Sequence, residues 1–289
     1  MHIATKAFRV PPGSRVKLKG RTTRIKPFYK SKKDYEETLA EHIGEMARLQ
    51  NLLYASGRHA LLVVLQAMDA AGKDGAIKHI LSGINPQGCE VFSFKKPDAE
   101  ELAHDFLWRT SRCLPERGKI GIFNRSYYEE VLVVRVHPEI LRAQNLPDEA
   151  LEDKQIWEGR FRSIRDLEEH LHRNGTRIVK FFLHISKKEQ RRRFLLRIDD
   201  PDRNWKFSQA DLAERQYWKD YTKAYEVCLG ATSSKIAPWY VVPADDKENA
   251  RLILSQVLLK TLKDLKMEYP ETSASRRREL QAIRKQLAG

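Results

Sequence analysis

The residues best suited to chemistry lie in one loop, residues 68–75, with the sequence Met-Asp-Ala-Ala-Gly-Lys-Asp-Gly. A run of branched apolar residues, Leu61–Leu65, precedes the loop and is typical of a strand buried on both faces. Apolar residues then return at helical spacing, so we expect a helix from about Asp74. A strand, a small-residue loop with Lys73 and a helix form the layout of a P-loop, whose lysine and backbone N–H groups hold phosphate oxygens.

This loop departs from the usual P-loop pattern. Ala67 stands where the first glycine is usual, and Asp74 replaces the hydroxyl residue after the lysine. Asp69 adds a carboxylate, which bound phosphates would repel unless a divalent cation lay between them. Mg²⁺ binds one or two carboxylates together with phosphate oxygens and water, so we expect Asp69 to bind Mg²⁺, with Mn²⁺ as the alternative ion. The interpretation without a phosphate is a tight strand-to-helix turn with Lys73 in solvent.

The overall composition describes a strongly charged globular protein. Its 289 residues include 53 Lys and Arg against 39 Asp and Glu, a formal net charge of +14. Such an excess favours a polyanionic partner, either nucleic acid or inorganic polyphosphate. We see neither a membrane-spanning run nor a secretory signal, so we expect a cytoplasmic protein without a membrane partner. Cys89, Cys113 and Cys228 lie far apart, which favours free thiols.

Composition divides the chain into three parts. Residues 1–30 form a basic arm without an acidic residue, expected to be extended and partly disordered when alone. An Arg-rich transit peptide is the weaker alternative for this arm. Residues 31–268 are expected to form one domain, in which a polar, Pro-bearing stretch at about 187–210 is interpreted as a lid. Residues 269–289 are a basic, amphipathic tail.

Strands alternate with helices through residues 31–268. This pattern predicts a three-layer α/β/α fold, with a parallel sheet of about five strands and helices on both faces. Single helices are expected from Asp98 to about Leu114 and over 148–173, whereas residues 131–136 fit a helix or a strand. The predicted strands are 61–65, 89–94, 119–124, 177–185 and 239–242, and the other predicted helices are 31–55, 74–81, 187–197, 208–229 and 245–266.

The strand at 119–124 delivers a second group of candidate residues at its carboxyl end, where open α/β sheets place ligands. Asn124 ends this strand. Arg125 would stabilise charge on a transferring phosphoryl group; the alternative is an ion pair with a neighbouring helix. Glu129 would support the acceptor side through metal-bound water or a nucleotide contact. The alternative for Glu129 is an acidic residue that offsets a helix dipole.

Further candidates are the groups that would hold phosphates. Lys78 lies one helical turn beyond the loop and would extend a basic channel. Arg193, Arg197 and Arg203 belong to the predicted lid and would close over the phosphates, which keeps out hydrolytic water. The alternative for such an arginine run is a solvated helix face. The P-loop itself supplies the candidates Ala70, Ala71, Gly72, Lys73, Asp74 and Gly75.

Three motifs together resemble the polyphosphate kinase 2 family of P-loop kinases. They are Met68–Gly75, Gly121–Glu129 and the lid segment Arg192–Arg197, which is followed by Trp205–Ser208. The resemblance covers roughly residues 30–265. It implies a thymidylate-kinase-like fold with a lid, reversible metal-dependent phosphoryl transfer between inorganic polyphosphate and nucleotides, and assembly into a homodimer or homotetramer.

One residue departs from many members of that family. Asn124 stands at the Walker B position, where those members carry Asp, so Asp69 is left as the clearest anionic metal ligand. Asn124 together with Glu129 resembles the subgroup that phosphorylates both AMP and ADP. The implied products are ADP and ATP, and guanine nucleotides are further candidate acceptors. The adenine site stays unassigned, because aromatic residues such as Trp218 and Tyr225 more often belong to a core.

Two other functions stay open at this point. One is a nucleoside monophosphate kinase with ATP as donor, which shares the fold. The other is a P-loop protein that binds nucleic acid through its basic ends. Sequence-tolerant binding of single strands combines a cationic groove with exposed aromatic residues, but residues 9–26 and 271–289 contain no aromatic residue. We therefore expect no specific nucleic-acid partner.

Overall fold

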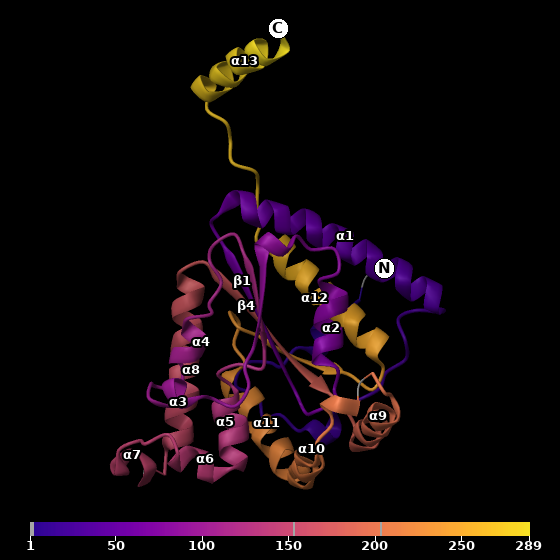
Figure 1. Ribbon diagram of the computed structural model, residues 1–289, viewed down its shortest axis with the longest axis vertical. Coiled ribbons are helices and arrows are strands. Elements are labelled where there is room, and N and C mark those ends of the chain that lie inside the picture. Colours follow the sequence, from indigo (N-terminus) through magenta and orange to yellow (C-terminus); the bar gives the residue numbers. More distant parts are fainter. Residues whose placement is uncertain (1–2, 153, 203) are drawn as a thin grey trace.

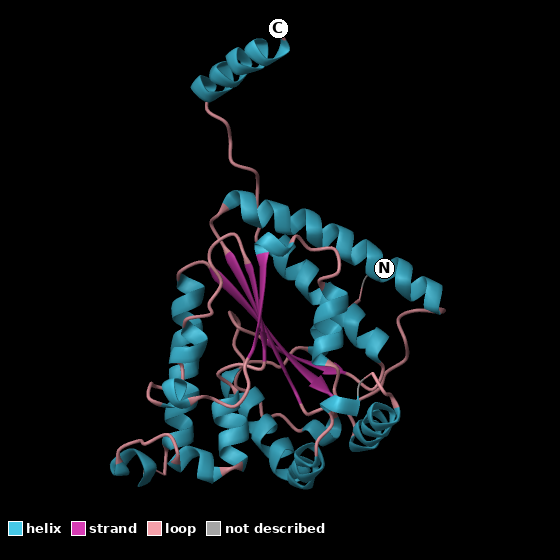
Figure 2. Cartoon of the chain, in the orientation of Figure 1, coloured by secondary structure: helices cyan, strands magenta, loops and turns pink. Residues whose placement is uncertain are grey.

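A single parallel sheet organises the molecule (Figure 2). The computed structural model describes residues 3–152, 154–202 and 204–289, and within them five strands pair in the order β2-β3-β1-β4-β5. β1 therefore lies at the centre, paired in parallel with β3 on one side and β4 on the other. The strands are β1 (Ala60–Ala67), β2 (Cys89–Ser93), β3 (Ile120–Asn124), β4 (Thr176–His184) and β5 (Trp239–Pro243). The predicted sheet is confirmed.

Helices cover both faces of the sheet, which gives three layers (Figure 1). Alternate residues of β1 enter two different cores, with Leu61 and Val63 on one side and Leu62 and Val64 on the other. Because both faces are buried, the strand has an unbroken apolar sequence. The first face is covered by α1 (Lys32–Ser56), α2 (Lys73–Ile80) and α12 (Lys247–Asp264), and the second by α5 (Glu129–Val136), α8 (Ile156–Arg173) and α11 (Trp218–Thr232).

The rest of the described chain adds helices outside these six. Residues 131–136, which fitted helix or strand, belong to the helix α5. The remaining α-helices of the described chain are α3 (Ala99–Leu102), α4 (Trp108–Ser111), α6 (Pro138–Arg142), α7 (Asp148–Glu152), α9 (Lys187–Asp199), α10 (Gln209–Glu214) and α13 (Ala274–Ala288). Single turns of 3-10 helix are η1 (Thr5–Phe8), η2 (Leu18–Gly20), η3 (Pro86–Gly88), η4 (Asn204–Lys206) and η5 (Arg215–Tyr217).

Three predicted helices are each divided in the structure, so those predictions were wrong. The helix predicted over 208–229 is formed by α10 and α11, with the 3-10 turn η5 between them. The other two are the helices predicted from Asp98 to about Leu114 and over 148–173. The first of these two stops after one turn, and α4 begins only at Trp108. The Asp105 carboxylate accepts the Leu107 N–H at 2.9 Å, a local bond that competes with helix continuation. The second is split into α7 and α8. α7 has no buried residue, whereas α8 buries Phe161 and Ile164 against the sheet.

The two chain ends behave differently. The basic arm is extended, yet Ile3, Val10 and Leu18 are buried against the domain. The Val10 N–H donates to the carbonyl of Trp239 in β5 at 2.9 Å, which fixes the arm along the sheet edge. The tail helix α13 has no buried residue and projects away from the domain (Figure 1). Within the part of the chain that the structure describes, no helix is long and apolar enough to cross a membrane.

Candidate active site

The P-loop connects β1 to α2 through a tight turn. Ala70 and Gly72 both adopt left-handed backbone conformations, with φ of 60° and 102°. Gly72 provides no side-chain cap for α2, so the first N–H groups of this helix are left for an anion. The Nζ of Lys73 donates to the carbonyl oxygen of Ala67 at 3.2 Å, which holds the ammonium beside the end of β1.

An ion pair joins the P-loop to the end of β3. Nη2 of Arg125 lies 3.5 Å from Oδ1 of Asp69, and both side chains remain partly exposed. Arg125 also has a left-handed backbone, with φ of 65°, and its N–H donates to the Leu65 carbonyl at 3.0 Å. Burial opposes the charge on this guanidinium, but Glu129 and Asp69 outweigh that effect and raise its pKa. Arg125 is therefore a permanent cation at the carboxyl end of the sheet.

Two further charges face this pair. Burial raises the pKa of Glu129, and the neighbouring Arg125 and Lys73 oppose that rise. The pKa of Lys73 is lowered by burial and by the charge of Arg125, although Asp69, Glu129 and Asp74 favour the ammonium. Cations and carboxylates thus alternate around one point, an arrangement suited to holding phosphate oxygens and a metal ion together.

The side chain of Asn124 contacts the first turn of α2 and the end of β2. Its Nδ2 donates to Oδ1 of Asp74 at 2.7 Å and lies 3.4 Å from Oγ of Ser93. The amide therefore connects the ends of β3 and β2 to the first turn of α2. A carboxylate at position 124 would meet the Asp74 carboxylate at the same place, so the neutral amide suits the contact.

Arg193 holds the P-loop from the lid side. Its guanidinium donates to the carbonyl oxygens of Ala70 and Ala71 at 3.1 and 2.8 Å, and to that of Ala244 at 2.6 Å. Glu189, one turn earlier on α9, accepts from Nε at 2.9 Å. The side chain is buried, and its guanidinium N–H groups donate to these protein oxygens, whereas the sequence predicted that they bind phosphates. In this structure Arg193 supports the loop, whereas phosphate binding by Arg193 stays a prediction.

Three more side chains were predicted to bind phosphate, and the structure does not place them beside Asp69 and Arg125. Lys78 is exposed on α2, one turn beyond the loop. The Arg197 guanidinium lies 5.9 Å from the ring centre of Phe194 on α9. Arg203 lies outside the described residues. The described geometry therefore brings together Asp69, Lys73, Arg125 and Glu129, with Asn124 joined to them through Asp74.

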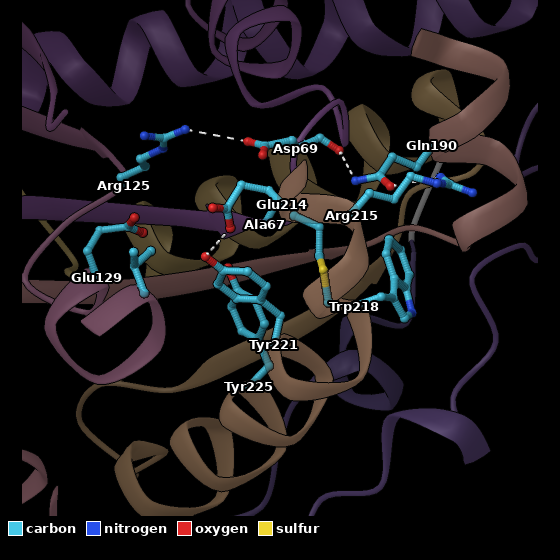
Figure 3. A pocket seen from close by; sticks show the side chains of 12 residues that line it. Ala67, Asp69, Arg125, Glu129, Gln190, Glu214, Arg215, Trp218, Tyr221 and Tyr225 are labelled. Carbon is cyan, nitrogen blue, oxygen red and sulfur yellow. Dashed lines mark hydrogen bonds and ion pairs between the residues drawn. The ribbon is translucent and has the colours of Figure 1, made fainter. Parts of the chain in front are cut away.

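A pocket of about 170 Å³ opens beside these residues (Figure 3). Asp69, Arg125 and Glu129 form one wall. The opposite wall comes from α9 to α11 and includes a row of residues spaced by four, three and four positions. Glu214 ends α10, and Trp218, Tyr221 and Tyr225 lie along one side of α11. The complete lining is Ala67, Met68, Asp69, Arg125, Glu129, Val133, Gln190, Glu214, Arg215, Trp218, Tyr221 and Tyr225.

This second wall was not predicted from the sequence. Its signal is the row Glu214, Trp218, Tyr221 and Tyr225, which mixes polar and aromatic residues at helical spacing. A row with that spacing also fits an ordinary core face, and Tyr225 is indeed 4% exposed. Only the position of α11 opposite the P-loop distinguishes a pocket wall from a core.

Hydrogen bonds fix this wall. Oε2 of Glu214 accepts the Tyr221 hydroxyl at 2.7 Å and lies 3.1 Å from Nε2 of His137. Arg215 donates to Oε1 of Gln190 at 3.0 Å, and Gln190 in turn donates to the Asp69 carbonyl at 3.1 Å. The lid is therefore connected to the P-loop by direct polar contacts.

The donor set for a metal ion is small. Among residues 3–152, 154–202 and 204–289, no group of three or more His, Cys, Asp or Glu side chains is arranged to hold an ion. Asp69 nevertheless presents a carboxylate, 34% exposed, at the edge of the pocket. One carboxylate completed by substrate phosphates and water is a donor set that Mg²⁺ accepts. The residues present therefore fit a metal ion that is bound jointly with the substrate.

The parallel sheet, the P-loop and the charged pocket at the carboxyl end of β1 and β3 define a phosphotransferase of the P-loop kinase class. A family model described as polyphosphate kinase 2 matches residues 29–270. The chain belongs to the polyphosphate kinase 2 family. The predicted family and fold are thereby confirmed, whereas the roles of the individual site residues stay predictions.

Similar proteins agree with this assignment. The chain is 64% identical over 287 residues to a Rhodopseudomonas palustris protein named ADP-polyphosphate phosphotransferase, with 99% of each chain covered. It is 45% identical over 271 residues to the AMP/ADP-polyphosphate phosphotransferase of Meiothermus ruber, with 92% of this chain and 96% of that one covered. The crystal structure of polyphosphate kinase 2 from Arthrobacter aurescens TC1 superposes with a TM-score of 0.85 at 40% identity, and 96% of each chain is covered.

Proposed function

We propose that the protein transfers phosphoryl groups from inorganic polyphosphate to ADP and AMP, reversibly and with Mg²⁺ as cofactor. Family membership supports the donor and the reaction class: the chain is a polyphosphate-dependent nucleotide kinase. The observation that carries the site assignment is the pocket between the P-loop and α11, whose wall includes Asp69, Arg125 and Glu129. Neither an ATP-driven monophosphate kinase nor a nucleic-acid-binding protein is favoured by these findings.

The donor end is assigned to the P-loop. Lys73 and the free N–H groups at the start of α2 would hold the terminal phosphates of the polymer. Arg125, opposite Asp69, would stabilise charge on the equatorial oxygens of the group in transfer. Mg²⁺ bound at Asp69 would neutralise phosphate oxygens that the protein itself cannot reach. The protein contributes position and charge, and it needs no covalent intermediate.

The acceptor is assigned to the pocket. Its phosphate would lie near Arg125 and Glu129, and its base would lie toward the aromatic side chains of Trp218 and Tyr221. Glu129 in its carboxylate form would orient the acceptor through bound water or a direct contact. The relatives support adenine nucleotides, since their names specify ADP in one case and AMP and ADP in the other. A Mycolicibacterium smegmatis relative, 34% identical over 227 residues, is named GDP-polyphosphate phosphotransferase, so guanine nucleotides stay part of the proposal.

The proposal also includes a cytosolic location and a homodimer or homotetramer. Light scattering coupled to size-exclusion chromatography measures the assembly state directly. A monomer at micromolar concentration would contradict the proposed oligomer but would not contradict the proposed reaction.

The test is a transfer assay with purified protein, Mg²⁺ and long-chain polyphosphate. AMP, ADP and GDP are supplied in separate reactions, and the products are separated by ion-exchange chromatography. We expect ATP from ADP, and ADP followed by ATP from AMP, with both activities lost when EDTA removes the metal. Absence of transfer from polyphosphate to every acceptor would contradict the proposal, and activity with ATP and AMP alone would favour the monophosphate kinase.

Asn124→Asp, measured in the same assay, tests the acceptor assignment. We expect a changed ratio of AMP to ADP phosphorylation, because the variant places a carboxylate where the amide now donates to Asp74. Ser93→Ala is the matched control, since it removes only the longer 3.4 Å contact of the same amide. An unchanged ratio in the Asp variant would exclude Asn124 from acceptor choice.

A further inference from the structure

A buried ion pair lies beneath the segment that carries Arg125 and Glu129. Lys180, in β4, donates from Nζ to Oε2 of Glu168 on α8 at 2.6 Å. The lysine side chain is 0% exposed and the glutamate side chain 2% exposed. The proposed reaction uses neither residue directly. A charge pair at this depth is costly unless its hydrogen-bonding groups are satisfied, so its partners indicate what it does.

The tyrosines between Arg125 and Glu129 are those partners. Tyr127 and Tyr128 both donate their hydroxyl hydrogens to Oε1 of Glu168, at 3.0 and 2.7 Å. Nζ of Lys180 makes two more bonds, to the Tyr128 hydroxyl at 2.9 Å and to the Thr232 carbonyl at 2.8 Å. All three hydrogens of the ammonium are therefore used. This network of Tyr127, Tyr128, Glu168 and Lys180 links β4 and α8 to the turn that follows β3.

The turn itself has a conformation that requires support. Arg125 occupies the left-handed region, which residues other than glycine seldom adopt and which persists only where the surroundings enforce it. The Tyr128 N–H donates to Oγ of Ser126 at 3.1 Å, which closes the turn locally. Arg125 and Glu129 line the pocket, whereas both tyrosine rings between them are fully buried in the core. The anchored tyrosines thus determine where the two pocket residues project.

We propose that Glu168 and Lys180 are positioning residues of the phosphoryl-transfer site. They hold Tyr127 and Tyr128, and through these rings they hold Arg125 and Glu129 against the P-loop. The inference rests on the proposed function, because it concerns the same site. Stability alone does not account for the charges, since apolar residues of similar volume commonly replace a buried ion pair without loss of stability.

The first test compares a single with a double variant. Lys180→Met leaves the Glu168 carboxylate buried without its cation, so we expect a clearly lower melting temperature. Lys180→Met/Glu168→Leu removes both charges and should regain stability relative to the single variant. We expect kcat of the double variant to stay about 10- to 100-fold below wild type, as for a misplaced catalytic group. KM for polyphosphate should change little, because the network does not contact the P-loop. Wild-type kcat in the double variant would overturn the proposal.

A second double variant keeps the test decisive if Lys180→Met/Glu168→Leu does not fold. Tyr127→Phe/Tyr128→Phe retains both rings and the ion pair but removes the hydroxyl groups that join them. We expect a lower kcat and an altered pH dependence of kcat, because Glu129 shifts relative to Arg125. Unchanged kcat and an unchanged pH profile would contradict the positioning role.

The control is Leu254→Ala on α12, a residue buried in the core on the opposite face of the sheet. It should lower the melting temperature with unchanged kcat at temperatures where the protein is folded. Wild-type protein in the same assay separates the two proposals. No transfer by wild type refutes the proposed function, whereas full transfer by wild type and by the tyrosine variant refutes the positioning role.

Discussion

Lys73 is the residue on which the donor end of the proposed site depends. Its ammonium lies at the end of β1, within hydrogen-bonding distance of the Ala67 carbonyl oxygen. Lys73→Ala is expected to lower kcat by roughly 10²- to 10³-fold, as for other preorganised charges that stabilise a transition state. The measurement is the polyphosphate assay with ADP.

Lys33→Ala is the matched control for that prediction, because Lys33 is exposed on α1 and has no proposed role in phosphate binding. Circular dichroism melting curves should show that both variants stay folded. Turnover close to wild type in Lys73→Ala would mean that the loop does not bind the donor.

Glu129 is expected to make the proposed reaction sensitive to acid. Burial raises the pKa of this carboxyl group above its ordinary value of 4.5, so it takes up a proton at a higher pH than an exposed glutamate would. The carboxylate is the form that we assign to acceptor orientation. Activity should therefore fall as the pH is lowered through the raised pKa, and Glu129→Gln should be slower and lack this acid limb. The measurement is kcat against pH.

Stability must be followed over the same pH range, so that unfolding is not mistaken for titration. An acid limb that persists unchanged in Glu129→Gln would assign it to another group.

Among single residues, those that could be predicted from sequence are the ones whose chemistry is local. Asp69 and Lys73 share one short loop, and Arg125 follows a recognisable strand, so the parallel sheet brings them together. The burial of Arg193 could not be predicted, because an arginine in a basic run has the same local sequence whether it faces solvent or a loop carbonyl. The same holds for Lys180, whose partners come from α8, α11 and the turn after β3.

At the scale of elements, α9 is attached to the P-loop by two side chains, Gln190 and Arg193. Arg193 bonds to carbonyls of the loop and to that of Ala244, next to β5. Arg193→Met should lower the free energy of unfolding by about 2–4 kcal/mol, since it leaves buried carbonyls without a donor and removes one of the two arginines that pair with Glu189. Urea denaturation measures this change.

The control for the Arg193→Met prediction is a variant of the preceding residue, Arg192. Arg192 also pairs with Glu189, at 2.6 Å, but its side chain is 58% exposed. Arg192→Met should cost less than about 1 kcal/mol, as for other surface ion pairs. Equal losses in the two variants would show that Arg193 acts only through Glu189 and not through the loop.

The elements themselves were largely predictable, with a physical reason for each exception. β1, β3, β4 and β5 are mostly buried and have the apolar runs that such strands need. The edge strand β2 is partly exposed and was predicted from its alternating sequence. The divided helices were missed because helical periodicity does not reveal a local break, such as the one where the Asp105 carboxylate accepts the Leu107 N–H. The pocket wall on α11 was missed because a pocket face and a core face share the same spacing.

For the whole molecule, the two basic ends are expected to differ in what they contribute. Deleting residues 1–20 removes Ile3, Val10, Val16 and Leu18, all buried in the domain. At roughly 1.5–3 kcal/mol for each fully buried apolar side chain, less the entropy of ordering the arm, the loss should reach several kcal/mol and on the order of 10 °C in melting temperature.

Deleting residues 271–289 is the matched comparison. The helix α13 buries no residue, so the melting temperature should stay within about 1 °C of wild type. Differential scanning calorimetry of both truncations checks the pair. A stable protein without the arm, or a destabilised one without the tail, would contradict the described packing.

The attachment of the arm to β5 also bears on how the chain is made. Arg9 and Val10 meet Tyr240 and Trp239, residues about 230 positions later, so the arm is synthesised long before the strand to which it binds. Contacts of such long sequence separation form slowly. Until β5 has been synthesised, the arm is an unattached polycation in a cell rich in polyanions. Its many positive charges and few apolar residues keep it soluble until it binds β5.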